Sequence, residues 1–310
     1  METSTVAASA AESAVWFDNT MAMSVILGFA VLFLIIDTLG GTFNKKGVFS
    51  FREIGVNIFS FINFLGIRVV TTAIWAFVFM TLLADYSGML KDVNFWIVFP
   101  IYVLLEEYIH YWIHRWSHSI PWLWRLHKPH HAPEHLNMTV SFRENWLWFA
   151  VIPNPIMTAA LIWAGQPEVA FIAVAWKGSS EWMVHTGYRW DLPLYENRFT
   201  GPIMRVVDKF ITMPDTHHAH HGVGRYGHGM CNFGSFLFLF DVLHGTAEFP
   251  RHKQDGFGMP KGVKLEKPTE QLWWPVMKDA VPADLHVVTA NESQGTRVFT
   301  GNNGRFSITM

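Results

Sequence analysis

Histidines recur in this chain at spacings that place several imidazoles on one helical face. His110, His114 and His118 follow one another at intervals of four, and segments 127–131 and 217–221 both have the pattern HxxHH. An α-helix turns once every 3.6 residues, so side chains three and four positions apart project from the same side. Burying imidazoles is costly unless each finds a partner, and a metal ion can bind several at once. The three patterns therefore predict a shared metal centre.

The number of candidate ligands favours two metal ions. A structural zinc ion is satisfied by four ligands, and a catalytic zinc ion by three and a water molecule. Imidazole also suits iron, copper and nickel, so the ligand type leaves the metal open. His118 forms a second HxxxH pair with His114, and both a ligand role and a supporting role stay open for it. The candidate ligands from these patterns are His110, His114, His118, His127, His130, His131, His217, His220 and His221.

Several other polar residues stand near these patterns. Metal-bound imidazoles usually donate their second N–H to a carboxylate or a carbonyl, which makes acids near the boxes candidate supporting residues. His218 should point away from its neighbours on a helix, whereas His135 and His228 either orient ligands or line the entrance. The competing interpretation is a set of unrelated core or surface histidines, but three patterned boxes disfavour it. The candidate supporting acids are Glu106, Glu107, Asp215 and Asp241.

The order HxxxH, HxxHH, HxxHH in an apolar chain resembles the membrane fatty acid hydroxylase and sterol desaturase superfamily from Glu106 to Thr246. Segments 131–137 and 214–222 are similar to the branch that contains alkylglycerol monooxygenase and its bacterial relatives. The resemblance implies a di-iron centre that activates dioxygen, with the isolated His185 as a further ligand. It also implies that Asn232 is a hydrogen-bond partner in the site.

The resemblance further implies a monooxygenase that hydroxylates a C–H bond of a lipid such as a fatty acyl chain, an ether lipid or a sterol. A desaturase with the same centre is an alternative, because only the fate of the substrate after hydrogen abstraction separates the two. A non-catalytic histidine-rich metal-binding protein is a third. The sequence has no Gly-rich dinucleotide motif, no haem-binding motif and a single cysteine, Cys231. We therefore expect an external donor, a ferredoxin or cytochrome b5 with its reductase. Arg115, Arg125, Lys128 and Arg143 are interpreted first as positively charged anchors at the cytoplasmic face, and alternatively as a basic docking surface for that donor.

The composition is that of a membrane protein. Half of the residues are hydrophobic and 15% are charged, against ~25% charged in soluble domains. A net charge of −2 and the lack of a basic run exclude a nucleic-acid partner. We expect an all-α, multi-span integral membrane helical bundle with a cytoplasmic histidine-rich cap.

Apolar stretches define the expected spans and domains. A polar segment covers residues 1–20, the membrane-embedded domain covers 21–246, and a polar tail covers 247–310, with Trp273 and Trp274 as an interfacial anchor and 291–310 without regular structure. A span needs ~20 apolar residues. The expected spans are 21–40, 69–83, 95–114, 146–164 and 167–185. An interfacial or tilted segment from residue 54 precedes the second span, and the last two spans form a hairpin hinged at Gly165 and Gln166. Pro129 is expected to kink or restart the helix that carries the second box, whereas Asp215 or Thr216 should cap the third-box helix and Gly222 should end it.

The loop charges predict the orientation. Lys45, Lys46 and Arg52 follow the first apolar stretch, whereas residues 1–20 contain no Lys or Arg. Positive loops face the cytoplasm, so the N-terminus is expected outside and the histidine boxes inside. The expected location is a bacterial inner membrane, or the endoplasmic reticulum in a eukaryote, with the active site on the cytoplasmic side.

Overall fold

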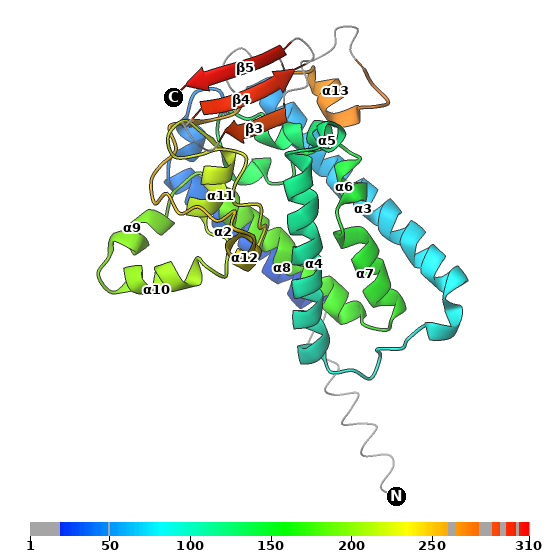
Figure 1. Cartoon of the computed structure of the whole chain (residues 1–310). Coiled ribbons are helices and arrows are strands. Elements are labelled where there is room, and N and C mark those ends of the chain that lie inside the picture. The colour runs from blue at the N-terminus through cyan, green and yellow to red at the C-terminus, as the bar shows by residue number, and fades with distance from the viewer. Residues whose placement is uncertain are drawn as a thin grey trace, which may run out of the picture.

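Long helices form the body of the molecule. The computed structural model describes residues 19–48, 50–259, 265–278, 287–291, 296–301 and 304–309, so most of the polar segment 1–20 lies outside the described residues. The helices that form the body are α2 (Asn19–Leu39), α3 (Phe51–Leu82), α4 (Phe95–Ser117), α7 (Asn154–Trp163) and α8 (Pro167–His185). α3 packs on α7, and α8 contacts α2, α4 and α7. Figure 1 shows α5 (Pro121–His131) and α13 (Pro268–Trp273) near one end of α4, with α9 (Asp191–Glu196) and α10 (Thr200–Val207) set to the side of the long helices.

One helix within the described residues is long and apolar enough to cross a membrane, by length and composition alone. This helix is α3, whose 32 residues extend about 48 Å at 1.5 Å per residue. Ser50 caps it by accepting the Glu53 N–H at 3.2 Å. Residues 54–68, expected as an interfacial or tilted segment, and residues 69–83, expected as a span, thus follow one another in a continuous helix that ends at Leu82.

The expected hairpin after residue 146 is interrupted. A short helix α6 (Trp148–Val151) ends before Pro153, and α7 starts again at Asn154 with Pro155 in its first turn. Prolines lack the N–H that a continuous helix needs, so 146–164 is not one helix. The ten residues of α7 extend only about 15 Å. The hinge itself is confirmed, since α7 and α8 meet at Gly165, which has a φ of 87°.

Short helices carry the second and third histidine boxes. α5 (Pro121–His131) begins at Pro121 and continues through Pro129, so the helix is not restarted there. Pro129 lacks the N–H that would bond to the carbonyl of residue 125, and the helix ends two residues later. α11 (Pro214–His221) begins after Met213, whose N–H donates to Thr216 Oγ1 at 3.2 Å, and ends at Gly222. α5 packs on α4, and α11 packs on α8.

The other elements are short. The remaining helices are η2 (Thr42–Asn44), η3 (Ala84–Tyr86), η4 (Met138–Val140), α9 (Asp191–Glu196), α10 (Thr200–Val207), α12 (Leu239–His244) and α13 (Pro268–Trp273). Strand β1 (Gly222–Val223) pairs antiparallel with β2 (Gly256–Phe257). Strands β3 (Val287–Asn291), β4 (Thr296–Gly301) and β5 (Gly304–Thr309) form an antiparallel sheet in the order β3-β4-β5. The helical class is confirmed, but the expectation of an all-α chain with an irregular end is wrong at these strands.

Buried contacts fix the helices that carry the boxes. Tyr102 and Val98 of α4 pack with Leu161 of α7 and Val169 of α8. The carboxylate of Asp37, at the end of α2, accepts N–H groups of Gly187 at 2.6 Å, Met138 at 2.9 Å and Tyr188 at 3.2 Å. Asp37 therefore ties α2 to the segment directly after His185.

Candidate metal centre

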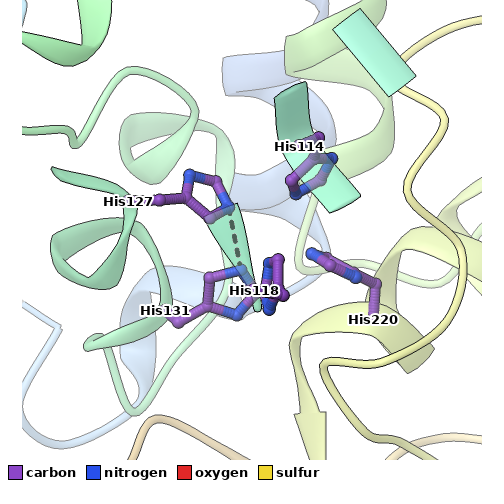
Figure 2. Close-up of side chains that lie close together, drawn as sticks. All are labelled: His114, His118, His127, His131 and His220. Atoms are coloured by element: carbon purple, nitrogen blue, oxygen red, sulfur yellow. Dashed lines mark hydrogen bonds between the residues drawn. The ribbon is translucent and has the colours of Figure 1, made fainter. Parts of the chain in front are cut away.

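Nine buried histidines meet where α4, α5, α8 and α11 converge. The first histidine group consists of His114, His118, His127, His131 and His220, and the second of His130, His185, His217 and His221. Within each group, all the ligand atoms lie within 4.8 Å of one another. The groups adjoin, because the rings of His131 and His221 stack with centroids 4.3 Å apart. Figure 2 shows the first group pointing toward a common centre.

Each HxxHH box is divided between the two groups. In the second box, the first and last residues, His127 and His131, belong to the first group, whereas His130 belongs to the second. In the third box the division is reversed, since His220 enters the first group and His217 and His221 enter the second. Side chains three and four residues on from a helical position lie about 100° apart around the axis, so one box can serve two neighbouring centres.

Hydrogen bonds at Nδ1, the ring nitrogen away from the centre of each group, orient Nε2, the inner nitrogen, toward that centre. The Nδ1 atoms of His114 and His220 lie 2.7 Å from the carbonyl oxygens of Phe233 and Cys231. His185 Nδ1 lies 2.7 Å from the Glu181 carbonyl. An Nδ1–H that donates to a carbonyl leaves Nε2 with its lone pair, which is the form of imidazole that binds metals.

The inner nitrogens fit metal ions. Among the described residues, the buried Nε2 atoms of His114, His118, His220 and His221 have no hydrogen-bond partner. Leaving such groups unsatisfied is costly, and a metal ion at the middle of each group would bind them. Burial lowers the pKa of the box histidines on α5 and α11 well below the usual value, which keeps the rings neutral; they are His127, His130, His131, His217, His220 and His221.

The structure places His110 outside both groups. His110 lies one turn before His114 on α4, with ring centroids 5.9 Å apart, and lines a neighbouring cavity. The HxxxH pair that enters the first group is His114 and His118, because the end of α4 lies against α5 and α11. His218 packs on Phe257 with centroids 5.5 Å apart, and His228 lies 2.8 Å from Glu248, so these two also stand apart.

A carboxylate that the sequence did not single out contacts the rings. Glu144 Oε1 accepts the Nδ1–H of His127 at 2.9 Å and lies 3.8 Å from Nδ1 of His130. One carboxylate therefore faces one histidine of each group. Burial raises the pKa of Glu144 well above its usual value, and nearby Glu181 adds to this. Its backbone N–H donates to Ser60 Oγ at 2.7 Å, which fastens the segment to α3.

The residues expected to support the metal ligands bind backbone groups or form ion pairs, and among the described residues they do not hydrogen-bond to the histidine rings. Asp241 accepts the N–H groups of Phe233 at 2.8 Å and Gly234 at 2.6 Å, and so fixes the loop whose carbonyl orients His114. Asn232 accepts from the Glu248 N–H at 2.7 Å and donates to the Thr216 carbonyl at 2.8 Å.

The three expected acids on α4 and α11 make ion pairs. Lys177 binds Glu106 at 3.2 Å and also binds Glu107. Asp215 pairs with Arg189 at 2.8 Å at the start of α11. Each acid therefore stabilises the element that carries a box.

Burial rules out a docking surface at two of the four expected basic residues, Lys128 and Arg143. Arg125 pairs with Glu270, Lys128 with Glu266, and Arg143 with Glu53. Arg115 donates to Tyr111 Oη at 3.0 Å. Lys128 and Arg143 are buried, so these side chains stabilise the cap. Trp274, expected as an interfacial anchor, packs under the Arg125 guanidinium at 4.8 Å.

A narrow cavity of about 70 Å³ adjoins both groups. His114, His127, His130 and His217 border it. Its lining includes apolar side chains, from Phe64, Phe142, Trp148, Phe149 and Ile152, and polar ones, from Arg68, Glu106, Asn154, Lys177 and Glu181. The histidine groups therefore have a space beside them in which an amphiphilic molecule can reach the ligands.

The fold and site define a helical protein with a histidine-rich centre suited to two metal ions. Residues 99–246, slightly less than half of the chain, match the family model described as fatty acid hydroxylase. All nine grouped histidines lie within the match. No solved structure gives a significant match.

Several curated proteins are similar to about half of this chain. A methylsterol monooxygenase of Arabidopsis thaliana is 25% identical over 47% of this chain and 46% of its own. An alkylglycerol monooxygenase of Danio rerio is 25% identical over 44% of this chain and 27% of its own. A very-long-chain aldehyde decarbonylase of Oryza sativa is 23% identical over 54% of this chain and 53% of its own. The chain thus matches about half or less of each relative. The equal identity to the first two leaves the alkylglycerol monooxygenase branch a prediction.

Proposed function

We propose that this protein is a non-haem di-iron monooxygenase that uses dioxygen to hydroxylate a C–H bond of a membrane lipid. The observation that carries the proposal is the pair of adjoining histidine groups whose inner nitrogens face one another beside an amphiphilic cavity. The similar methylsterol and alkylglycerol monooxygenases support this reaction class.

The residues of the chain divide the work of the site. The first group would hold one iron ion and the second group the other, and iron supplies dioxygen activation and removal of a hydrogen atom from carbon when it is bound. The carbonyls of Phe233, Cys231 and Glu181 hold the rings of His114, His220 and His185 in the metal-binding tautomer. The apolar side chains of the cavity exclude water and position the hydrocarbon part of the substrate.

We propose that α2, α3, α4 and the α7–α8 hairpin lie in the membrane, with the histidine groups at the cytoplasmic face. Large apolar side chains project outward from three of these helices, including Leu27 of α2 (59% exposed), Phe77 of α3 (71%) and Trp96 of α4 (77%). Exposed apolar surface of this extent is typical of a membrane contact. The cytoplasmic placement rests on Lys45, Lys46 and Arg52. A C-terminal reporter that is active only outside the cell would contradict it.

Lipid mass spectrometry tests the reaction. Iron-loaded protein given dioxygen, lipid, a ferredoxin or cytochrome b5, and the matching reductase should add one oxygen atom to a lipid. Loss of two hydrogen atoms would identify the desaturase instead. Iron-loaded protein that alters no lipid would support the non-catalytic metal-binding alternative. Omitting the electron carrier should stop turnover, and sustained turnover with NAD(P)H alone would contradict the need for an external donor.

A further inference from the structure

The cavity beside the histidine groups contains a carboxylate oxygen without a partner. Glu106 Oε2 accepts from Lys177 at 3.2 Å. Among the described residues, the other oxygen, Oε1, is buried and has no hydrogen-bond partner. Glu106 is 2% exposed and borders the cavity. A buried carboxylate oxygen without a donor is costly, so this position favours a ligand that brings one.

The cationic groups of the cavity are already engaged. Lys177 binds Glu106 and Glu107 at once. Arg68 donates to Asn154 and lies over the Phe64 ring at 4.8 Å. The lining residues include three carboxylates, Glu106, Glu144 and Glu181, against these two cations. Lys177 is therefore already paired, and the described side chains around Glu106 leave the donor that Oε1 lacks to be brought by a ligand.

We propose that the cavity binds the hydroxyl group of a neutral lipid alcohol, which donates its O–H to Glu106 Oε1. A hydroxyl supplies the missing donor without bringing a charge, whereas burying an ammonium group would cost more. The hydrocarbon next to the hydroxyl lies against the apolar side chains of Phe142, Trp148 and Phe149. This assignment rests on the proposed function, since it names the substrate class of the same site.

Equilibrium binding of two lipids of equal chain length tests the assignment. Iron-loaded protein in detergent at about pH 8 is titrated with radiolabelled hexadecanol and with hexadecanoic acid, which is ionised there. Wild-type protein should bind the alcohol at least about tenfold more tightly, since a hydrogen bond to a charged group accounts for that much. Equal affinities, or tighter binding of the acid, would overturn the assignment without any variant.

Variants of Glu106 provide a second test of the assignment. Glu106→Leu should weaken alcohol binding about tenfold or more, whereas Glu106→Gln keeps an acceptor and should restore part of it while improving binding of the acid. Glu168→Gln, at an exposed carboxylate of α8, is the matched control and should change neither affinity. Unchanged alcohol binding in folded, iron-containing Glu106→Leu would refute the role of Glu106.

A parallel product assay separates the two proposals. Oxidised lipid products without a preference for the alcohol would overturn this inference and leave the monooxygenase proposal intact. Selective alcohol binding with no oxidised product, in the presence of dioxygen and an electron donor, would overturn the monooxygenase proposal and leave the binding site intact.

Discussion

Replacing Glu144 with alanine removes the carboxylate that accepts the Nδ1–H of His127 at 2.9 Å. The ring of His127 would then lose the hydrogen-bond partner that fixes its orientation and its tautomer. Loss of such a supporting group typically weakens metal binding about 10-fold to 100-fold, or roughly 1.4–2.8 kcal/mol. The first group should weaken more than the second, because His130 Nδ1 is 3.8 Å from Glu144.

Competitive titration with a chromophoric chelator measures the two affinities for ferrous iron in anaerobic buffer. Glu144→Gln keeps an acceptor and should lie near the lower end of that range. Glu134→Gln removes an exposed carboxylate just after the same box and should bind iron like the wild type. If folded Glu144→Ala retains wild-type affinity for both ions, then Glu144 does not orient the histidines and the argument from its position is wrong.

Three further predictions concern the rest of the site. Arg189→Ala removes the ion-pair partner of the buried carboxylates of Asp191 and Asp215. Thermal unfolding should show that this variant is destabilised by about 3–5 kcal/mol. Arg198→Ala, at an exposed arginine, is the control, and equal stability of the two variants would contradict the prediction. Burial lowers the pKa of the box histidines on α5 and α11, so the unfolded chain, with histidine pKa values near ~6.5, binds more protons below that pH. The free energy of unfolding of the metal-free protein should therefore reach its full value above pH ~6.5 and fall on acidification by up to ~1.4 kcal/mol per pH unit per histidine. An unfolding midpoint that stays constant from about pH 7 to 5 would exclude this. His220→Ala should abolish turnover and reduce bound iron without loss of membrane insertion, whereas exposed His252→Ala should do neither; full turnover by His220→Ala would remove it from the centre.

The histidine boxes could be predicted from the sequence because the three histidines of an HxxHH pattern project from the same side of a helix. Periodicity could not decide between His110 and His118, since both form an HxxxH pair with His114 on the same stripe. The choice depends on how far α4 extends toward α5 and α11, which is a property of tertiary packing.

Residues far apart in the chain account for the other differences. Glu144 stands 17 residues after His127 in a loop held by Ser60 of α3, and no local pattern joins these positions. Lys128 and Arg143 looked like surface cations, but Glu266 and Glu53 neutralise them from distant segments. Hydropathy alone also missed the break at Pro153, since proline interrupts a helix without making the stretch polar.

The division of each HxxHH box between the two groups links the filling of the two sites. An ion bound in the first group orders α5 through His127 and α11 through His220, and the same two helices present His130 and His221 to the second group. The second ion then meets ligands whose conformational entropy has already been lost, which favours its binding. Iron should therefore load with positive cooperativity, and chains at limiting iron should contain two ions or none more often than one.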